Sequence, residues 1–198
     1  LMQGLADGYF VLPYTIGDYL ADDIRTGKIS TDSPEFDAAE QSVRSQIDAF
    51  ITNKGTKTVD YFHRKLGKII WNKCGMSRNK KQLEEAIAEV KALREEFYRD
   101  VFVPGTADSF NEPLAKALRV ADFLELGELF AKDALERSES CGGHFREESQ
   151  TPEGEALRDD DNFTFVSAWE HKGEPSKAKL HKEALTYENI ELKTRSYK

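Results

Sequence analysis

Residues 111–136 read NEPLAKALRVADFLELGELFAKDALE, and this segment indicates the architecture of the chain. Asn111 is a typical N-terminal helix cap. Two apolar stripes follow at helical spacing: Leu114, Leu118, Ala121 and Leu124, and then Leu126, Phe130 and Ala134. A helix that is apolar on more than one side is usually central, so we expect this helix to lie inside a helical bundle.

Three helical patterns precede this segment. The first begins at Ser33-Pro34-Glu35, a cap followed by proline, and ends at residues 53–55. The second runs from about Thr58 to Cys74 and is ended by Gly75. The third, from about Asn79 to Val101, is amphipathic and should lie on the surface of the bundle. Its expected polar side carries Glu84, Glu85, Arg94 and Glu95.

The beginning of the chain reads as a further helix, extending to about Ile24 and ended by Gly27. Pro13 should kink or split it, because proline removes a backbone donor. The chain opens inside an apolar stretch, Leu1 to Phe10, with no helix cap before it and no signal-peptide pattern. We interpret this opening as the cut end of a longer protein; a processed native chain is the alternative.

Composition narrows the class of protein. The 198 residues are 39% hydrophobic and 32% charged, as in a globular protein rich in surface charge. The net charge of −8 argues against a nucleic-acid-binding surface, which would need clustered Lys and Arg. No run approaches the roughly 20 apolar residues that cross a bilayer. Cys74 and Cys141 lie far apart and indicate no disulfide framework, which favours a reducing compartment.

The segment after the central pattern is rich in reactive side chains: residues 137–146 read RSESCGGHFR. Cys141 and His144 could suggest a zinc site, but such a site usually needs four ligands. The other candidates, Cys74, His63, His171 and His181, are scattered over different predicted elements. Nucleophilic catalysis by Cys141 is equally weakly supported, because known thiol enzymes separate the nucleophile from its base. We therefore predict no metal site and no complete active site.

The remainder of the chain changes in texture. Residues 147–161 are polar and aperiodic, which predicts a loop. Residues 163–169 alternate like a half-buried strand, and residues 180–187 could pair with them as a hairpin. The predicted fold is mainly α: a three-helix-type bundle with an extra N-terminal helix and a small C-terminal hairpin. We expect three parts: a helix remnant and linker (1–30), the bundle (31–140), and a loop with a two-stranded tail (141–198).

Two parts of the sequence resemble one family, the flavoprotein subunit of succinate dehydrogenases and fumarate reductases. Residues 137–146, followed by Arg158-Asp159-Asp160-Asp161-Asn162, are similar to a family signature of the form Arg-x-Glu-Ser-Arg-Gly-x-His-x-Arg. Residues 1–8 look like the segment that comes directly after a Gly-Ala-Asn-Arg-Leu-Gly stretch of the family's flavin-binding domain, so the resemblance implies that residues 1–30 are the end of that domain. Two departures exist: Cys141 stands where most members have Arg, and residues 147–157 are longer than usual. Both departures resemble the branch of this family found in bacterial enzymes with a single di-haem cytochrome b anchor.

The resemblance implies a function for a longer parent protein. The parent would interconvert succinate and fumarate by hydride transfer with FAD, and its catalytic residues would precede Leu1, so this chain carries none. The backbone of Leu1 would contact FAD, and no cofactor is expected in the remaining chain. Glu139, His144 and Arg146 are the implied residues of interdomain packing.

The implied surroundings follow from the same resemblance. The partners would be the flavin-binding domain, the iron–sulfur subunit and, indirectly, a membrane cytochrome b, at the cytoplasmic face of the bacterial inner membrane. Two alternatives remain open from the residues: a stand-alone helical interaction module, and a small metal- or thiol-dependent enzyme using Cys141 and His144.

Overall fold

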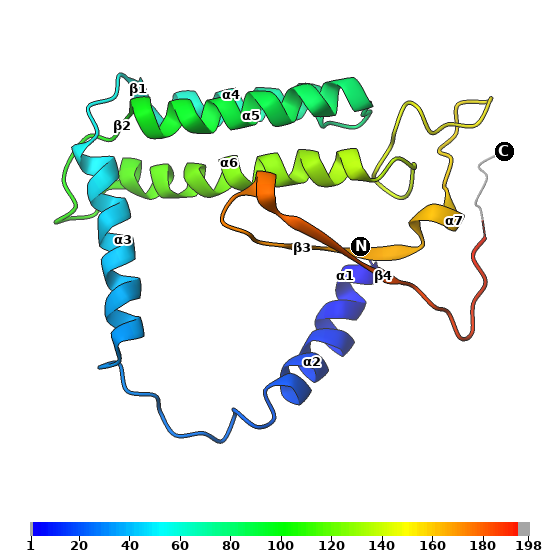
Figure 1. Cartoon of the computed structure of the whole chain (residues 1–198), viewed down its shortest axis with the longest axis horizontal. Helices are drawn as coiled ribbons and strands as arrows, with labels where there is room; N and C mark the ends of the chain where they lie inside the picture. The colour runs from blue at the N-terminus through cyan, green and yellow to red at the C-terminus, as the bar shows by residue number, and fades with distance from the viewer. Residues whose placement is uncertain (1, 194–198) are drawn as a thin grey trace. The chain divides into compact units, whose positions relative to one another are not determined.

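The computed structural model describes residues 2–193, which are mainly helical (Figure 1). The helical segments are α1 (Met2–Ala6), the π-helical η1 (Asp7–Val11), α2 (Leu12–Tyr19), α3 (Pro34–Thr52), α4 (Val59–Lys73), α5 (Lys80–Asp100), α6 (Glu112–Glu136), α7 (Asp160–Phe163) and the 3-10 helix η2 (Pro175–Lys177). The strands are β1 (Lys57–Thr58), β2 (Val101–Phe102), β3 (Phe165–Glu170) and β4 (Lys179–Ala184). The predicted mainly-α class with a small C-terminal hairpin is confirmed.

Internal contacts divide the chain into two compact units, with the division between Arg44 and Ser45, inside α3. Each unit is described by itself. The three-part organisation expected from the sequence stays a prediction.

The first unit begins with the contiguous segments α1, η1 and α2. The N–H of Leu12 bonds the carbonyl of Asp7, five residues back, and Pro13 follows at once. The expected interruption at Pro13 is therefore a widened turn before the proline, which has no N–H to continue the ladder. The helix ends at Tyr19, so the predicted end at Ile24 to Gly27 was wrong, because the backbone of Leu20 leaves the helical region.

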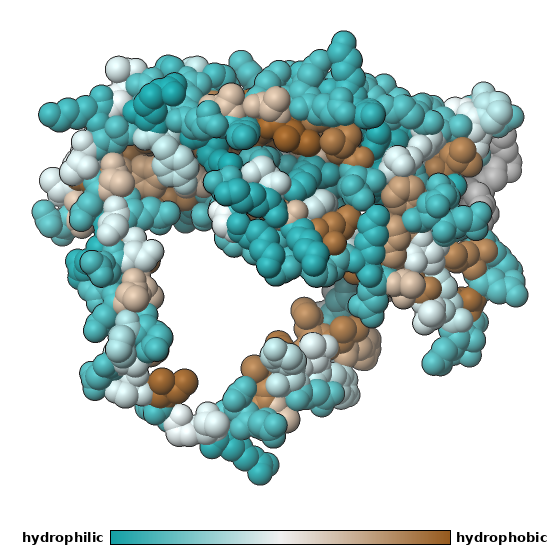
Figure 2. Space-filling view, in the orientation of Figure 1, coloured by the Kyte–Doolittle hydropathy of each residue, from teal (hydrophilic) through white to brown (hydrophobic). Residues whose placement is uncertain are grey.

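Apolar side chains of the first unit are largely exposed within it. Tyr9 is 73% and Phe10 70% exposed, and in Figure 2 tan and brown side chains lie along α1, η1 and α2. Such a run of uncovered apolar residues is typical of a surface that another polypeptide covers.

The second unit is built around α4, α5 and α6, which pack on one another. Each begins at a capping side chain: Thr58 accepts a hydrogen bond from Tyr61 N, Asn79 from Gln82 N, and Asn111 from Leu114 N. Each then buries an apolar face. The most deeply buried large apolar residues are Phe62, Leu83, Val90, Leu93, Phe97, Val101 and Leu124.

The end of α5 is tied to the start of α4 by a short parallel pairing of β1 with β2, in which Lys57 lies opposite Val101. This pairing was not predicted, because two residues are too few to give a pattern. Gly55 lies where the incoming chain passes the end of α5. A Cβ atom there would come within 2.2 Å of the backbone of Asp100, so only glycine fits.

Helix α6 contacts both α4 and α5, and these contacts bury most of its first stripe and Ala134 of its second stripe. Leu126 is 58% exposed and Phe130 45%, so the prediction that the second stripe lies inside the bundle was wrong for these two residues. Helices α4 and α5 cover only one side of α6, and the uncovered side of α6 forms an apolar groove. Its lining includes Ile70 and Trp169.

The C-terminal hairpin is antiparallel, with β3 and β4 in register from Phe165 opposite Ala184 to Glu170 opposite Lys179. The predicted strand limits were off by two residues at the start of β3, by three at the end of β4 and by one at the other two ends. The predicted loop at 147–161 is right except at its end, where α7 begins. Asp159 caps α7 through a hydrogen bond accepted from Asn162 N, a local contact that aperiodic sequence does not reveal.

Phe97 tests the core. It is fully buried and its ring contacts those of Phe50 and Phe62. Phe97→Ala should lower the free energy of unfolding by about 3–5 kcal/mol through lost burial and a residual cavity. Phe110→Ala, at a residue 91% exposed, is the matched control and should change it by less than about 0.5 kcal/mol. Urea unfolding measures both, and equal effects would contradict the described core.

Candidate functional site

Residues 137–146, here called the strap, make a tight reversal after α6. Cys141 and His144 exchange backbone hydrogen bonds of 2.9 and 3.0 Å. Gly142 lies between them with φ +58°, in the left-handed region that favours glycine. The bend expected at Gly142-Gly143 is therefore a closed hairpin turn.

Arg146 returns from this turn to the end of α6. Its Nη1 donates to the carbonyl oxygens of Ala134, Leu135 and Arg137 at 3.1–3.3 Å, and its Nε donates to Glu148. The residue is 3% exposed. The last carbonyls of a helix have no partner within the helix, and a buried cation there also complements the helix dipole. The side chain of Arg146 therefore caps the C-terminal end of α6.

His144 connects the strap to the end of α4 through Arg78. Its Nδ1 lies 2.8 Å from Arg78 Nη1, and its Nε2 lies 2.7 Å from the carbonyl oxygen of Arg137. A guanidinium only donates and a carbonyl only accepts, so the ring is neutral, with its proton on Nε2. Burial lowers the pKa of His144, and the charges of Arg78, Arg146 and Arg137 lower it further.

Glu139 connects the strap to the C-terminal hairpin. It is 3% exposed, its Oε1 lies 2.6 Å from Arg137 Nη1, and its Oε2 accepts a hydrogen bond from Asp159 N. Arg137 in turn donates to the carbonyl oxygens of Phe163 and Phe165 and lies over both rings. The three predicted packing residues therefore lie together, and their contacts within this chain join three elements.

The geometry around Cys141 bears on the alternative of a thiol enzyme. Cys141 is exposed, but both ring nitrogens of His144 are already bonded, so this imidazole has no free lone pair to deprotonate the thiol. Among residues 2–193, no three His, Cys, Asp or Glu side chains form a group that could hold a metal. His181 instead pairs with Glu170, and Cys74 is buried in the core. Leu1 lies outside the described residues.

Arg78 was not anticipated from the sequence. Its Nε donates to the carbonyl oxygens of Cys74 and Gly75 at the end of α4, and its guanidinium lies over the Phe130 ring. Arg78 therefore bonds the carbonyl groups at the end of α4, as Arg146 bonds those at the end of α6. The only available signal was an arginine just after a helix stop, a common position for a basic residue.

A buried ion pair between α5 and α6 was also missed. Glu128 is 1% exposed, and its Oε2 lies 3.1 Å from Arg94 Nη1, close enough for an ion pair but without hydrogen-bond alignment. Arg94 was predicted on the solvent side of its helix and is instead partly buried. Burial raises the pKa of Glu128, although Arg94 opposes this shift.

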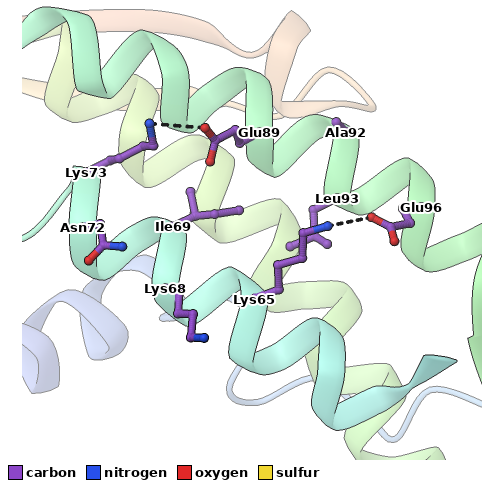
Figure 3. Close-up of a pocket in the computed structure, with 9 residues that line it drawn as sticks. All are labelled: Lys65, Lys68, Ile69, Asn72, Lys73, Glu89, Ala92, Leu93 and Glu96. Carbon is purple, nitrogen blue, oxygen red and sulfur yellow. Dashed lines mark hydrogen bonds and ion pairs between the residues drawn. The ribbon is translucent and has the colours of Figure 1, made fainter.

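A groove of about 400 Å³ follows the seam of α4 and α5 (Figure 3). Ion pairs of Lys73 with Glu89 and of Lys65 with Glu96 cross it, and Ile69 lies between them. Its cations are thus largely neutralised by neighbouring acids, and the groove offers no pair of catalytic groups.

These features define a class of protein: a helical domain whose strap holds two helix ends and a hairpin. No helix among residues 2–193 is long and apolar enough to cross a membrane. The family model described as fumarate reductase flavoprotein C-term matches residues 63–197. That is more than half of the chain, so the chain belongs to this family, and the resemblance inferred from the strap is confirmed.

Individual relatives agree with this assignment. The chain is 27% identical over 127 residues to the fumarate reductase flavoprotein subunit of Proteus vulgaris, covering 64% of this chain and 20% of the relative. It is 27% identical over 131 residues to that of Helicobacter pylori, with 66% and 18% covered. The chain thus spans about a fifth of the length of these relatives.

Solved structures show the same fold. A quinol-fumarate reductase with menaquinol molecules matches with a TM-score of 0.70 and 21% identity, over 86% of this chain and 28% of its own. Adenylylsulfate reductase from Archaeoglobus fulgidus matches with a TM-score of 0.63 and 12% identity, over 93% and 29%. At these identities the likeness concerns the fold alone.

Arg146 provides a test of the strap. Arg146→Ala should lower the free energy of unfolding by about 2–4 kcal/mol, because buried carbonyls and Glu148 lose a charged donor. Arg119→Ala, at an exposed position of α6, is the matched control and should cost less than about 0.5 kcal/mol. Denaturant unfolding followed by circular dichroism compares them, and a cost below that of the control would exclude the capping role.

Glu128 provides a pH test. Its pKa in the folded chain lies above the ordinary 4.5, so the unfolded chain ionises first as the pH rises. The stability contributed by the neutral acid is therefore full below pH 4.5 and lost as the pH rises through the folded pKa. As the pH increases from 4 to about 8, the melting temperature of Glu128→Gln should rise relative to that of the wild type.

Glu95→Gln, at an exposed position of α5, is the control and should track the wild type across this range. A shift in the opposite direction for Glu128→Gln would show that the Arg94 ion pair outweighs burial.

Proposed function

We propose that this chain is the structural, helical C-terminal domain of the FAD-containing subunit of a succinate:quinone oxidoreductase. The observation that supports this most is the coincidence of the family match with the strap. The residues that resemble the family signature, Glu139, His144 and Arg146, make hydrogen bonds to the end of α6, to Arg78 and to Asp159, within the matched range.

The activity belongs to the parent subunit in this proposal. FAD there supplies hydride transfer between succinate and fumarate. At the N-termini of α4, α5 and α6, the side chains of Thr58, Asn79 and Asn111 already accept a hydrogen bond from the helix backbone, which leaves fewer N–H groups for a phosphate at these three places. We therefore assign no catalytic residue and no step of the reaction to the described chain, and contact of the Leu1 backbone with FAD remains part of the proposal.

The partners follow the same proposal. The flavin-binding domain of the parent would cover apolar residues of the first unit, such as Tyr9 and Phe10, which are exposed here. The iron–sulfur subunit would contact the helical domain, and a cytochrome b subunit would hold the complex at the cytoplasmic face of the bacterial inner membrane. Glu139, His144 and Arg146 would serve interdomain packing by fixing the strap in a single shape.

The alternative is a stand-alone helical interaction module. The large exposed apolar surface of the first unit is compatible with it, since any protein partner could cover such a surface. The two proposals differ in what the chain needs: only the first requires a flavin domain to restore activity.

The test uses the purified 198-residue chain. It should be colourless, contain far less than one flavin per chain and fail to reduce a dye with succinate, since the reacting groups belong to the rest of the parent. Absorbance at flavin wavelengths and a dye-coupled assay measure this. Co-expression with a relative's flavin domain should yield a complex, with the flavin domain alone as the control. Stoichiometric flavin or turnover in the isolated chain would overturn the proposal.

A further inference from the structure

Helix α4 presents an unusual combination of side chains on its outer side. Arg64, Lys68 and Trp71 recur at helical spacing, so they share the side opposite the buried residues of this helix. All three are exposed, and Trp71 is 82% exposed. We call these three residues the α4 outer face.

The charges of this face are not neutralised within the described chain. The neighbouring lysines of α4 are paired: Lys65 with Glu96, and Lys73 with Glu85 and Glu89. Among residues 2–193, Arg64 and Lys68 form no ion pair, and in Figure 3 Lys68 points away from α5. A chain with a net charge of −8 therefore displays two free cations one helical turn apart.

Trp71 adds an apolar anchor beside these cations. Tryptophan and arginine, together with tyrosine, are the residues most enriched where a few side chains dominate a protein–protein contact. Gly67 lies between Lys68 and Arg64 along the helix, and nothing lies within 4 Å of the position that its Cβ would occupy. The backbone of another helix could approach α4 closely there.

We propose that the α4 outer face binds an acidic amphipathic helix of a partner protein. Carboxylates spaced four residues apart on that helix would match Arg64 and Lys68, and its apolar stripe would cover the ring of Trp71. Charge complementarity supports this occupant. A second copy fits poorly, because antiparallel α4 helices crossing near Gly67 would bring Arg64 opposite Lys68. A membrane surface fits poorly too, since anionic lipids select clusters of four to eight cations.

The inference is independent of the proposed function, because it rests on three exposed residues of α4 and on no residue of the strap or of the first unit. Its test needs only the 198-residue chain and a defined probe: a labelled synthetic helix with a leucine stripe flanked by glutamates. A second peptide carries lysines in place of the glutamates. Fluorescence anisotropy should show saturable binding of the glutamate peptide and much weaker binding of the lysine peptide.

Two variants locate the site. Arg64→Glu combined with Lys68→Glu should weaken binding of the glutamate peptide at least about tenfold, because the charge pattern is reversed. The same variant should strengthen binding of the lysine peptide. Trp71→Ala should also weaken binding of the glutamate peptide at least about tenfold. The matched control is Lys81→Glu combined with Arg99→Glu, the same charge change at exposed positions of α5, which should change binding less than about threefold.

The gain of lysine-peptide binding keeps the test informative even where the reversal lowers stability. Equal losses in the reversal and control variants would show unspecific charge attraction and overturn the proposal, as would absence of glutamate-peptide binding. Sedimentation and anionic vesicles test the other occupants. Self-association or vesicle binding that depends on the same three residues, at concentrations where the glutamate peptide does not bind, would overturn it as well.

Discussion

The end of α6 leaves carbonyl groups that no residue of the helix can bond, and the chain satisfies them with one arginine. At its C-cap, Arg137, the backbone leaves the helix in an extended conformation and not in the left-handed one of a glycine cap. Arg146 therefore has to come back to the helix end. This return requires the tight turn at Gly142 and places Glu139, Ser140 and Arg146 in buried positions.

The consequences of that return spread through hydrogen bonds. Ser140 is fully buried, and its hydroxyl accepts a bond from the N–H of Arg146 and donates to its carbonyl. A buried backbone group without a partner would cost free energy, and here the Ser140 hydroxyl bonds both the N–H and the carbonyl of Arg146. Arg78 repeats the arrangement at the end of α4 and reaches His144. Two helix ends and one turn thus form a single polar network, and such networks favour one structure over alternatives.

The helices could be predicted from the sequence, but this polar network could not. Periodicity and caps such as Asn79 and Asn111 located α3 to α6 to within a residue or two, since apolar spacing and capping are local properties. The contacts of Arg78 with His144, and of Arg94 with Glu128, join residues 66 and 34 positions apart. No local pattern encodes such pairs. Leu126 and Phe130 were misplaced for a related reason: an apolar stripe shows that a surface is to be covered, but not whether this chain covers it.

Position 141 shows what the fold does and does not demand of the strap. Cys141 joins the turn through its backbone N–H and carbonyl, while its side chain is exposed and makes no hydrogen bond among the described residues. The turn therefore makes no demand on the side chain of residue 141. Glu139 and Arg146 differ in kind, because their buried charged groups are bonded to the backbone on which the turn and the hairpin depend. The fold itself thus accounts for the identity of residues 139 and 146, whereas any constraint on residue 141 has to come from what lies against the exposed side of the strap.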